Sequence, residues 1–347
     1  MRLTLRRPDD WHVHLRDGAA LGCVVGFTAE RFGRAIVMPN LQPPVTTTAQ
    51  AGAYRERILG ALPAQARFTP LMTLYLTDTT TPGEIERARA AGFVHGVKLY
   101  PAGATTHSEA GVTDIRKTYA ALERMAELGM PLLVHGETTR PDIDVFDRET
   151  VFIDELLAPL LERFKPLKVV FEHITTARAA EFVEHARAGV AATITPQHLL
   201  HNRNAIFQGG LRPHYYCLPV LKREQDRRAL IAAATSGNPR FFLGTDSAPH
   251  ERTAKEAGCG CAGMFTAHAA IELYAEVFEA AGRLERLEGF ASEHGADFYG
   301  LPRHEERITL IKDPWVPPQS YAFGGGSLIP YRAGEPVGWR LEPAGHV

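Results

Sequence analysis

The sequence predicts an α/β protein, a (β/α)8 TIM barrel with a metal site at the C-terminal ends of the strands. Eight short apolar segments alternate with stretches of helical periodicity, which is the pattern of repeated strand–helix units. The segments are apolar almost throughout, as parallel strands are when helices cover both faces of their sheet. Several of them end in a histidine, a lysine or an aspartate, and the active sites of such barrels lie where the strands end.

The expected strands and helices follow one another along the chain. The first strand holds His12, and two of the helices are expected over residues 113–128 and 176–188, where apolar residues recur every three or four positions behind a polar cap. An open, doubly wound sheet is the alternative architecture, because the pattern fixes the strand count only to within one or two. The other seven strands are expected over residues 34–38, 68–76, 94–100, 131–135, 168–173, 189–195 and 240–245.

A single domain is expected over residues 1–347. Chains of about 200 to 400 residues are usual for such a barrel, and no repeat or low-complexity segment divides this one. Residues 313–318 and 323–338 are rich in Pro and Gly, which disfavour regular elements. From about residue 313 the chain is therefore expected to wrap irregularly over the barrel.

Charge and cysteine content exclude several classes of protein. The 40 acidic residues nearly balance the 38 basic ones and both are scattered, so a small-molecule substrate is expected rather than nucleic acid or a membrane. No uninterrupted apolar run reaches the roughly 18 residues of a membrane span, and the N-terminus lacks the apolar core of a signal peptide. The four cysteines follow no disulfide spacing of secreted proteins, so a reducing cytoplasm is the expected location.

Four histidines are candidate zinc ligands. His12 and His14 can bind one ion together, because residues two apart on an extended chain project from the same face. His135 and His173 each end an apolar segment, where a histidine that merely packs in the core would be unusual. Imidazole is a common zinc ligand. For the His-Val-His sequence taken alone, packing or hydrogen bonding within a strand is the alternative.

An aspartate and a lysine extend this candidate site. Asp246 follows the apolar segment FFLGT, where a carboxylate is costly to bury without a cation, and an N-cap is its alternative role. Lys98 is one of only seven lysines against 31 arginines, and none precedes it. A buried lysine loses its charge or pairs with a carboxylate, and a salt bridge is the alternative here. A neutral amine can instead capture carbon dioxide to form a carbamate, a carboxylate that can bridge two metal ions.

Six short motifs, in order along nearly the whole chain, resemble the amidohydrolase superfamily and, within it, the short bacterial type of dihydroorotase. The resemblance is specific, because six separated motifs are not expected to match in order by chance. The motifs are WHVHLRD (11–17), MPN (38–40), KLYPAGATT (98–106), GVTD (111–114), GTDSAPH (244–250) and GCGCAG (258–263).

This resemblance implies two Zn²⁺ ions in each subunit and an enzyme that hydrolyses a cyclic amide and catalyses the reverse reaction. Two dications that share a water lower its pKa and so supply hydroxide at neutral pH. Asp246 is implied as the catalytic residue that passes a proton from the hydroxide to the leaving amide nitrogen. The implied ligands are His12, His14 and Asp246 for one ion, His135 and His173 for the other, and carbamylated Lys98 with the hydroxide as the bridge.

The implied reaction interconverts N-carbamoyl-L-aspartate and L-dihydroorotate in de novo pyrimidine (UMP) synthesis. Arg16 would share a strand face with His14, and its planar guanidinium matches a carboxylate, although a rim ion pair is the alternative. Asn40 and His250 are expected to complete this carboxylate clamp, unless they are a turn residue and a solvated loop residue. The other implied contacts are backbone groups at Leu218 and Ala262 for the ring edge, and Thr105 and Thr106 on a loop over residues 102–111 that covers the substrate.

Hydantoinases and allantoinases would share the metal ligands and are the nearest alternative. They resemble longer chains with a small β-domain built partly from sequence before the His-x-His motif, whereas eleven residues precede His12 here, and Arg16 with Asn40 favours an acidic substrate. A non-catalytic scaffold is least expected, because such relatives typically lose ligands. A homodimer is implied by the resemblance alone. Cys259 and Cys261 lack a second cysteine pair, so they are expected to be structural.

Overall fold

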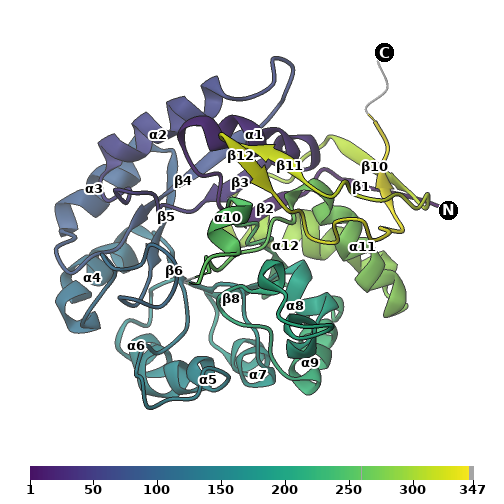
Figure 1. Cartoon of the computed structure of the whole chain (residues 1–347). Helices are drawn as coiled ribbons and strands as arrows, with labels where there is room; N and C mark the ends of the chain where they lie inside the picture. Colours follow the sequence, from purple (N-terminus) through teal and green to yellow (C-terminus); the bar gives the residue numbers. More distant parts are fainter. Residues whose placement is uncertain (259, 344–347) are drawn as a thin grey trace.

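Eight parallel strands form a barrel surrounded by helices in the computed structural model, which describes residues 1–258 and 260–343 (Figure 1). Each strand pairs in parallel with the next one along the chain. The strands are β2 (Asp9–Val13), β3 (Arg34–Val37), β4 (Thr69–Tyr75), β5 (Val94–Leu99), β6 (Leu132–Val134), β7 (Val169–Phe171), β8 (Val190–Ile194) and β9 (Phe241–Leu243).

The residues that follow β9 close the barrel against β2. The Asp246 N–H donates to the His12 carbonyl oxygen at 2.9 Å, and the His14 N–H donates to the Ser247 carbonyl oxygen at 3.0 Å. These two bonds join the last strand to the first. The predicted (β/α)8 barrel is therefore confirmed, and the open doubly wound sheet is excluded.

Helices connect successive strands and cover the outside of the barrel (Figure 1). Local sequence fixes their ends: Thr47 forms a capping box with Gln50 at the start of α2, and Gly92 ends α3 with the left-handed backbone that glycine adopts readily. The α-helices are α1 (Gly18–Arg31), α2 (Thr48–Gly60), α3 (Pro82–Ala91), α4 (Tyr119–Leu128), α5 (Arg148–Phe152), α6 (Ala158–Arg163), α7 (Ala177–His185), α8 (Pro196–Leu200), α9 (Glu224–Thr235), α10 (Arg252–Lys255), α11 (Ala270–Ala280) and α12 (His294–Tyr299).

Shorter helical turns lie between these elements. The 3₁₀ turns are η1 (Ile115–Thr118), η3 (Arg203–Ile206), η4 (Pro213–Tyr215), η5 (Ala267–Ala269) and η6 (Leu284–Arg286), and the π turns are η2 (Ile153–Leu157) and η7 (Gly289–Glu293). The two predicted helices are confirmed with changed bounds. Asp114 caps η1, which leads directly into α4, and α7 stops short of residue 188 because Ala186 has an extended backbone.

Several strands end earlier than the sequence predicts, because the chain turns before it reaches the metal-ligand candidates. The strands β6 and β7 stop before His135 and His173, and β9 stops three residues before Asp246. The backbone φ is +41° at His173 and +44° at Asp246, which is the left-handed region rather than a strand conformation. These candidates therefore lie on the first residues of the βα loops.

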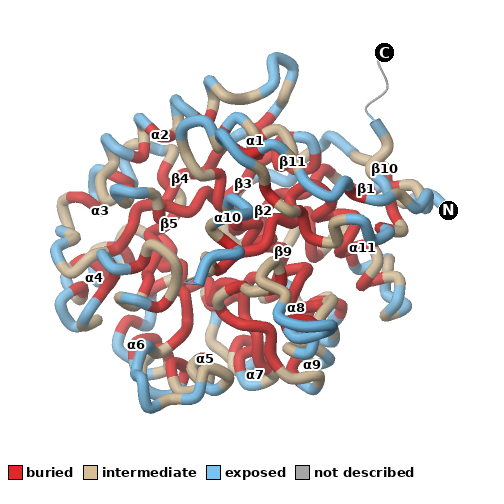
Figure 2. The backbone as a smooth tube through the Cα atoms, in the orientation of Figure 1, coloured by how far each residue is buried: buried red, intermediate tan, exposed pale blue. Residues whose placement is uncertain are grey.

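Buried apolar residues form one core between the sheet and the helices and another inside the barrel. Figure 2 colours the barrel strands mostly as buried. Inside, the Trp11 indole stacks on the Tyr299 ring of α12, with 4.7 Å between ring centroids. Apolar side chains from every barrel strand except β5 contribute to this inner core, and β5 places Lys98 in the barrel instead. The inner core contains Trp11, Ile36, Met38, Leu71, Leu133, Val170, Ala191, Phe242 and Ala296.

Smaller strands lie outside the barrel. The strands β1 (Arg2–Arg6), β10 (Arg307–Ile311) and β13 (Arg340–Leu341) form an antiparallel sheet, and β11 (Tyr321–Phe323) pairs with β12 (Gly326–Leu328) in a hairpin. From residue 313 to 343 these short strands are joined by irregular segments. Within the described chain, no helix has the length and hydropathy needed to cross a membrane.

Candidate metal centre and adjoining pocket

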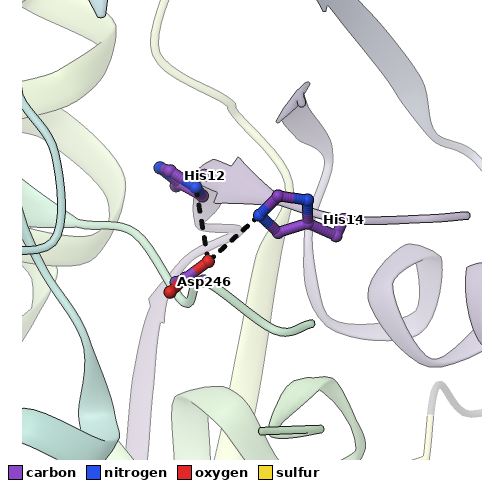
Figure 3. Close-up of side chains that lie close together, drawn as sticks. All are labelled: His12, His14 and Asp246. Atoms are coloured by element: carbon purple, nitrogen blue, oxygen red, sulfur yellow. Dashed lines mark ion pairs between the residues drawn. The ribbon is translucent and has the colours of Figure 1, made fainter. Parts of the chain in front are cut away.

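Three predicted ligands meet at the mouth of the barrel. The Nε2 atoms of His12 and His14 lie 3.3 and 3.1 Å from the same carboxylate oxygen, Oδ1 of Asp246 (Figure 3). All three residues are buried. Burial alone would raise the pKa of Asp246, but its close contacts with the two histidines hold it well below its ordinary value. One oxygen and two imidazole nitrogens this close together can hold a divalent cation.

A second group of predicted ligands adjoins the first. The His173 ring lies 4.9 Å from the His12 ring and 4.9 Å from the His135 ring, measured between centroids. Burial lowers the pKa of both His135 and His173, which keeps them neutral and able to bind a metal. The structure therefore brings the four predicted histidines together in one continuous row.

Lys98 lies on β5, fully buried beneath these histidines. Its Nζ atom and the Nδ1 atom of His173 have no hydrogen-bond partner among the described residues. Burial lowers the pKa of Lys98 to about 8, so the neutral amine is accessible near neutral pH. The predicted alternative of a direct salt bridge is wrong for residues 1–258 and 260–343. Buried polar atoms without partners are rare in proteins, and here they fit a site for metal ions and a modified lysine.

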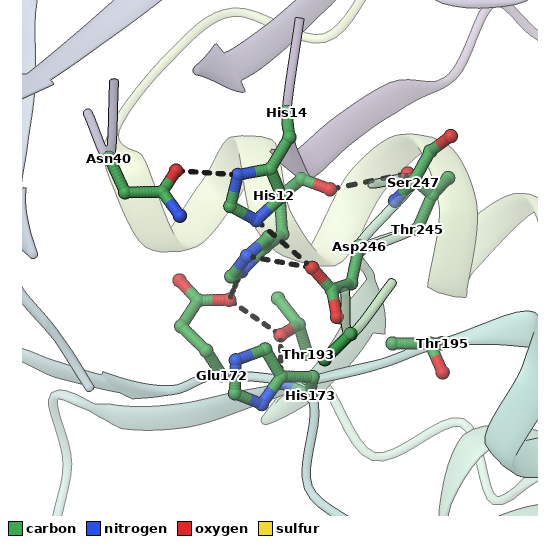
Figure 4. A network of polar contacts seen from close by, with 12 residues as sticks. His12, His14, Asn40, Glu172, His173, Thr193, Thr195, Thr245, Asp246 and Ser247 are labelled. Atoms are coloured by element: carbon green, nitrogen blue, oxygen red, sulfur yellow. Dashed lines mark hydrogen bonds and ion pairs between the residues drawn. The ribbon is translucent and has the colours of Figure 1, made fainter. Parts of the chain in front are cut away.

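Three hydrogen bonds orient the histidines from behind, and Figure 4 shows those of His12 and His14. The Nδ1 atom of His12 donates to Oε2 of Glu172 at 2.8 Å, and Nε2 of His135 donates to Oε2 of Glu137 at 2.9 Å. The Nδ1 atom of His14 donates to the side-chain oxygen of Asn40 at 2.7 Å. The Nε2 atoms of His12 and His14 are thereby left to face the centre, beside Asp246. A carboxylate or carbonyl on the outer nitrogen is the usual support for a metal-binding histidine.

Two of these supporting residues were missed in the sequence. Glu137 lies two residues after His135, and Glu172 directly precedes His173, so their positions beside predicted ligands were the available signal. Glu172 nevertheless supports a different histidine, His12, which lies 160 residues away in the chain. Only the closed barrel brings the two together.

Replacing Glu172 with glutamine is expected to weaken zinc binding roughly 10-fold, because outer partners of metal-binding histidines typically contribute 10- to 100-fold in affinity. The glutamine keeps the size of the side chain but loses the charge that accepts from both His12 and the Thr193 hydroxyl. Competition with a chromophoric chelator measures the affinity. The exposed Glu184→Gln on α7 is the matched control, and equal zinc affinities in the two variants would contradict this support.

A pocket adjoins the histidines, and every predicted substrate-binding residue lines it. The wall also includes Tyr100, Ala248 and Gly263, which were not predicted. The predicted residues on the wall are Arg16, Asn40, Thr105, Thr106, Leu218, His250 and Ala262.

The alternation of side chains along a strand does not explain how Arg16 comes to line this pocket. The strand β2 ends at Val13, and φ is +58° at Arg16, so the expected shared strand face with His14 is wrong. The guanidinium instead lies against the next loop, where Nε donates to the Pro249 carbonyl oxygen at 2.8 Å and Nη2 lies 2.9 Å from Nε2 of His250. No carboxylate pairs with it in the described part of the chain. It is therefore free to bind an anionic group.

His250 and Asn40 flank this guanidinium with different contacts. Burial, with Arg16 nearby, lowers the pKa of His250 to about 2, so its ring is neutral. Its Nε2 atom also lies 3.0 Å from the Ala262 carbonyl oxygen. The side-chain oxygen of Asn40 is occupied by His14, which leaves its amide nitrogen as the group that can donate to a ligand.

The predicted covering loop folds over the pocket. The Ala262 N–H donates to the Thr106 hydroxyl oxygen at 3.2 Å, and the Thr105 N–H donates to the Ser108 hydroxyl oxygen at 2.9 Å. The first bond joins the loop to the opposite wall, and the second holds the loop's own turn. Cys261 lies on that wall, and its N–H donates to the Ala254 carbonyl oxygen. Cys259 lies outside the described residues.

Comparison with known proteins gives a consistent result. A model of the amidohydrolase family matches residues 10–316. A dihydroorotase of Methylobacillus flagellatus is 67% identical over 98% of this chain and 99% of its own length. The crystal structure of a Saccharomyces cerevisiae dihydroorotase in complex with 5-fluoroorotic acid superposes with a TM-score of 0.90 at 35% identity, over 99% of both chains. An L-hydantoinase of Arthrobacter aurescens shares the fold, with a TM-score of 0.82 but 17% identity, over 98% of this chain and 83% of its own.

Proposed function

From the premise that the chain belongs to the amidohydrolase family and, within it, to the dihydroorotases, we propose that it interconverts N-carbamoyl-L-aspartate and L-dihydroorotate with two zinc ions. It is a hydrolase that acts on a cyclic amide C–N bond. One observation carries the zinc proposal: four histidines, an aspartate and a lysine without a hydrogen-bond partner among the described residues meet in one buried cluster. Arg16, which has no carboxylate partner among the described residues, lies beside this cluster. Pyrimidine synthesis is the process that uses this reaction.

The donor set suits zinc. One ion would be held by His12, His14 and Asp246, whose three donor atoms already lie within 4.8 Å of one another. The second would be held by His135 and His173. Imidazole nitrogen and carboxylate oxygen are the ligands that zinc takes in catalytic sites. Lys98 would bridge the two ions as a carbamate, which its unpartnered, partly neutral amine favours.

Bound zinc would lower the pKa of a coordinated water and polarise the amide carbonyl that the water attacks. Asp246 is the residue that moves the proton. Its carboxylate is ionised and lies at the mouth of the pocket, so it can accept a proton from the attacking water. The water oxygen bonds to the amide carbon, the C–N bond breaks, and Asp246 returns the proton to the ring nitrogen. The reverse sequence closes the ring.

The rest of the pocket would select the substrate. Arg16, with His250 and the amide nitrogen of Asn40, would bind the carboxylate that dihydroorotate carries beside its ring amide. Backbone groups of Leu218 and Ala262 would bind the edge of the ring. Thr105 and Thr106 would contact the substrate from the covering loop and exclude water when the loop closes. Loop closure of this kind completes many active sites.

Replacing Arg16 with alanine is expected to raise KM for dihydroorotate roughly 10- to 100-fold, since a hydrogen-bonded charge pair contributes about 1.5–3 kcal/mol. The Arg16→Lys variant keeps the charge but loses the forked geometry, so it is expected to recover only part of the affinity. Steady-state kinetics separate KM from kcat. The exposed Arg178→Ala on α7 is the control, and an unchanged KM in the Arg16 variants would remove this residue from the clamp.

The preference of the enzyme for dihydroorotate over hydantoin tests the proposed substrate. The purified enzyme should open dihydroorotate, which carries a ring carboxylate, far faster than hydantoin, which carries none. Preference for hydantoin would keep the fold and metal site but contradict the carboxylate clamp, and inactivity towards both would favour a non-catalytic scaffold.

We also propose that the chain forms one domain over residues 1–347, assembles as a homodimer and works in the cytoplasm. Light scattering tests the dimer directly.

A further inference from the structure

A buried lysine outside the metal centre joins two walls of the pocket. Lys255, the last residue of α10, is 4% exposed. Its Nζ atom donates to three backbone carbonyl oxygens, at 2.7 Å to Tyr216, 2.9 Å to Cys261 and 2.7 Å to Gly263. An ammonium group has three N–H donors, so all of them are used.

These contacts are unusual for a lysine at this depth. No carboxylate pairs with Lys255 within residues 1–258 and 260–343, although buried lysines ordinarily pair with one. The groups that face it are Cys217, Cys261 and the guanidinium of Arg16, and burial lowers its pKa to about 8. The three carbonyl dipoles oppose that effect by favouring the charged form. Lys255 therefore serves as a three-way hydrogen-bond donor rather than as half of an ion pair.

The three carbonyls belong to two backbone strips: residues 216–218, which include Leu218, and residues 261–263, which include Ala262. Tyr216 is two residues from Leu218, while Cys261 and Gly263 flank Ala262 on either side. The two strips also bond directly, because the Gly263 N–H donates to the Tyr216 carbonyl oxygen at 3.0 Å.

The backbone at Gly263 allows little adjustment. Its φ is +148°, and a Cβ there would lie 2.5 Å from the Ala248 carbonyl oxygen, so only glycine fits. Lys255 thus donates to a segment whose backbone packs tightly against Ala248 on its other side. Leu218 and Ala262, one on each strip, both line the pocket.

The Ala262 peptide is also connected to the rest of the site. Its carbonyl oxygen lies 3.0 Å from Nε2 of His250, and its N–H donates to the Thr106 hydroxyl oxygen. A shift of this peptide would therefore disturb both the proposed carboxylate clamp, through His250, and the covering loop, through Thr106. No other described side chain donates to both backbone strips.

We propose that Lys255 is a positioning residue for substrate recognition: its three hydrogen bonds hold Leu218 and Ala262 at the separation at which the substrate ring binds between them. The proposal rests on the proposed function, because that function places the ring edge at these two residues. It predicts that loss of the ammonium weakens binding of the ring without removing zinc, since Lys255 touches none of the metal-ligand candidates.

The Lys255→Met variant of the zinc-loaded, full-length enzyme tests this prediction, because methionine fills the space of the lysine side chain but donates no hydrogen bond. We expect 5-fluoroorotic acid, measured by calorimetry, to bind roughly 10- to 100-fold more weakly, as a displacement of about 1 Å in an active site can cost about 100-fold. KM for dihydroorotate should rise by a similar factor, with a smaller change in kcat. Zinc content should remain two ions per chain.

Two further variants make the result decisive. Lys255→Gln retains amide donors that can satisfy some of the carbonyls, so it should fold and show a smaller loss of affinity in the same direction. Lys168→Met is the control, because Lys168 also donates to a backbone carbonyl, that of Phe298, but precedes β7 at the opposite end of the barrel. Its affinity for 5-fluoroorotic acid should equal that of the unmodified enzyme.

The proposal is overturned if a folded Lys255 variant binds 5-fluoroorotic acid as tightly as the unmodified enzyme does. It is also overturned if both variants fail to fold, or lose zinc and melting temperature in step with affinity, because the lysine would then serve the fold alone. Failure of the proposed function would appear separately, as an unmodified enzyme that does not open dihydroorotate.

Discussion

Replacing Asp246 with alanine is expected to lower kcat for dihydroorotate by a factor of about 10³ or more. Removing a general acid–base group alone typically costs 10²- to 10⁴-fold, and alanine also removes the oxygen that lies between His12 and His14. The carboxylate is ionised in the folded protein, and among the described residues that line the pocket it is the only carboxylate. The loss should therefore appear in kcat rather than in KM.

A paired variant, Asp246→Asn, separates the two roles of Asp246. Asparagine tolerates the positive φ of this position better than alanine does and keeps an oxygen for the metal, yet its amide cannot accept the proton. Asp246→Asn should therefore retain more zinc than Asp246→Ala while remaining nearly inactive. Steady-state kinetics, metal analysis and circular dichroism measure activity, zinc and fold. Substantial turnover by folded Asp246→Asn would contradict the proton-transfer role.

Replacing Lys98 with alanine is expected to lower both zinc affinity and activity by at least about 100-fold. The loss of an outer partner of a metal ligand already costs 10- to 100-fold, and a bridging ligand contacts both ions directly. The Lys98 amine has no hydrogen-bond partner in the described residues, so the protein offers no obvious substitute. Its removal also opens space in a fully buried position.

Chemical rescue distinguishes the carbamate from an ordinary structural lysine. A short carboxylic acid such as acetate or propionate can occupy the space left by Lys98→Ala and supply a carboxylate there. We expect such acids to restore part of the zinc content and activity, with saturation at high concentration. The Lys98→Arg variant, which fills the space with a permanent charge, should not respond. Full activity in Lys98→Ala without any added acid would show that no bridge is needed.

Much of the fold could be predicted because its signals are local. Parallel strands covered on both faces must be apolar almost throughout, and helices reveal themselves by their periodicity, so eight strands could be counted in the sequence alone. The exact strand ends could not, because the turns at His173 and Asp246 depend on left-handed backbone that tertiary contacts impose. The predicted ligands still converge, since the ends of parallel strands meet at one rim whatever the precise bounds are.

The residues that support the site were harder to predict, since their partners are distant in sequence. Glu172 bonds His12 across 160 residues, and Lys255 bonds Tyr216 across 39. Neither residue type in its local context indicates such a partner. Arg16 was assigned to the right pocket for a wrong reason. The assignment assumed a strand face shared with His14, but the backbone leaves the strand conformation after Val13. Sequence patterns therefore found the groups proposed for the chemistry, and only the folded chain revealed what holds them in place.

A zinc titration tests the binuclear site most directly. The enzyme is stripped of metal with a chelator, and dihydroorotate opening is followed as zinc is added back in known ratios to the chain. We predict negligible activity in the stripped enzyme and a rise that reaches its plateau at two zinc ions per chain. Full activity without metal, or a plateau at one ion, would contradict the proposal that both groups of histidines hold zinc for catalysis.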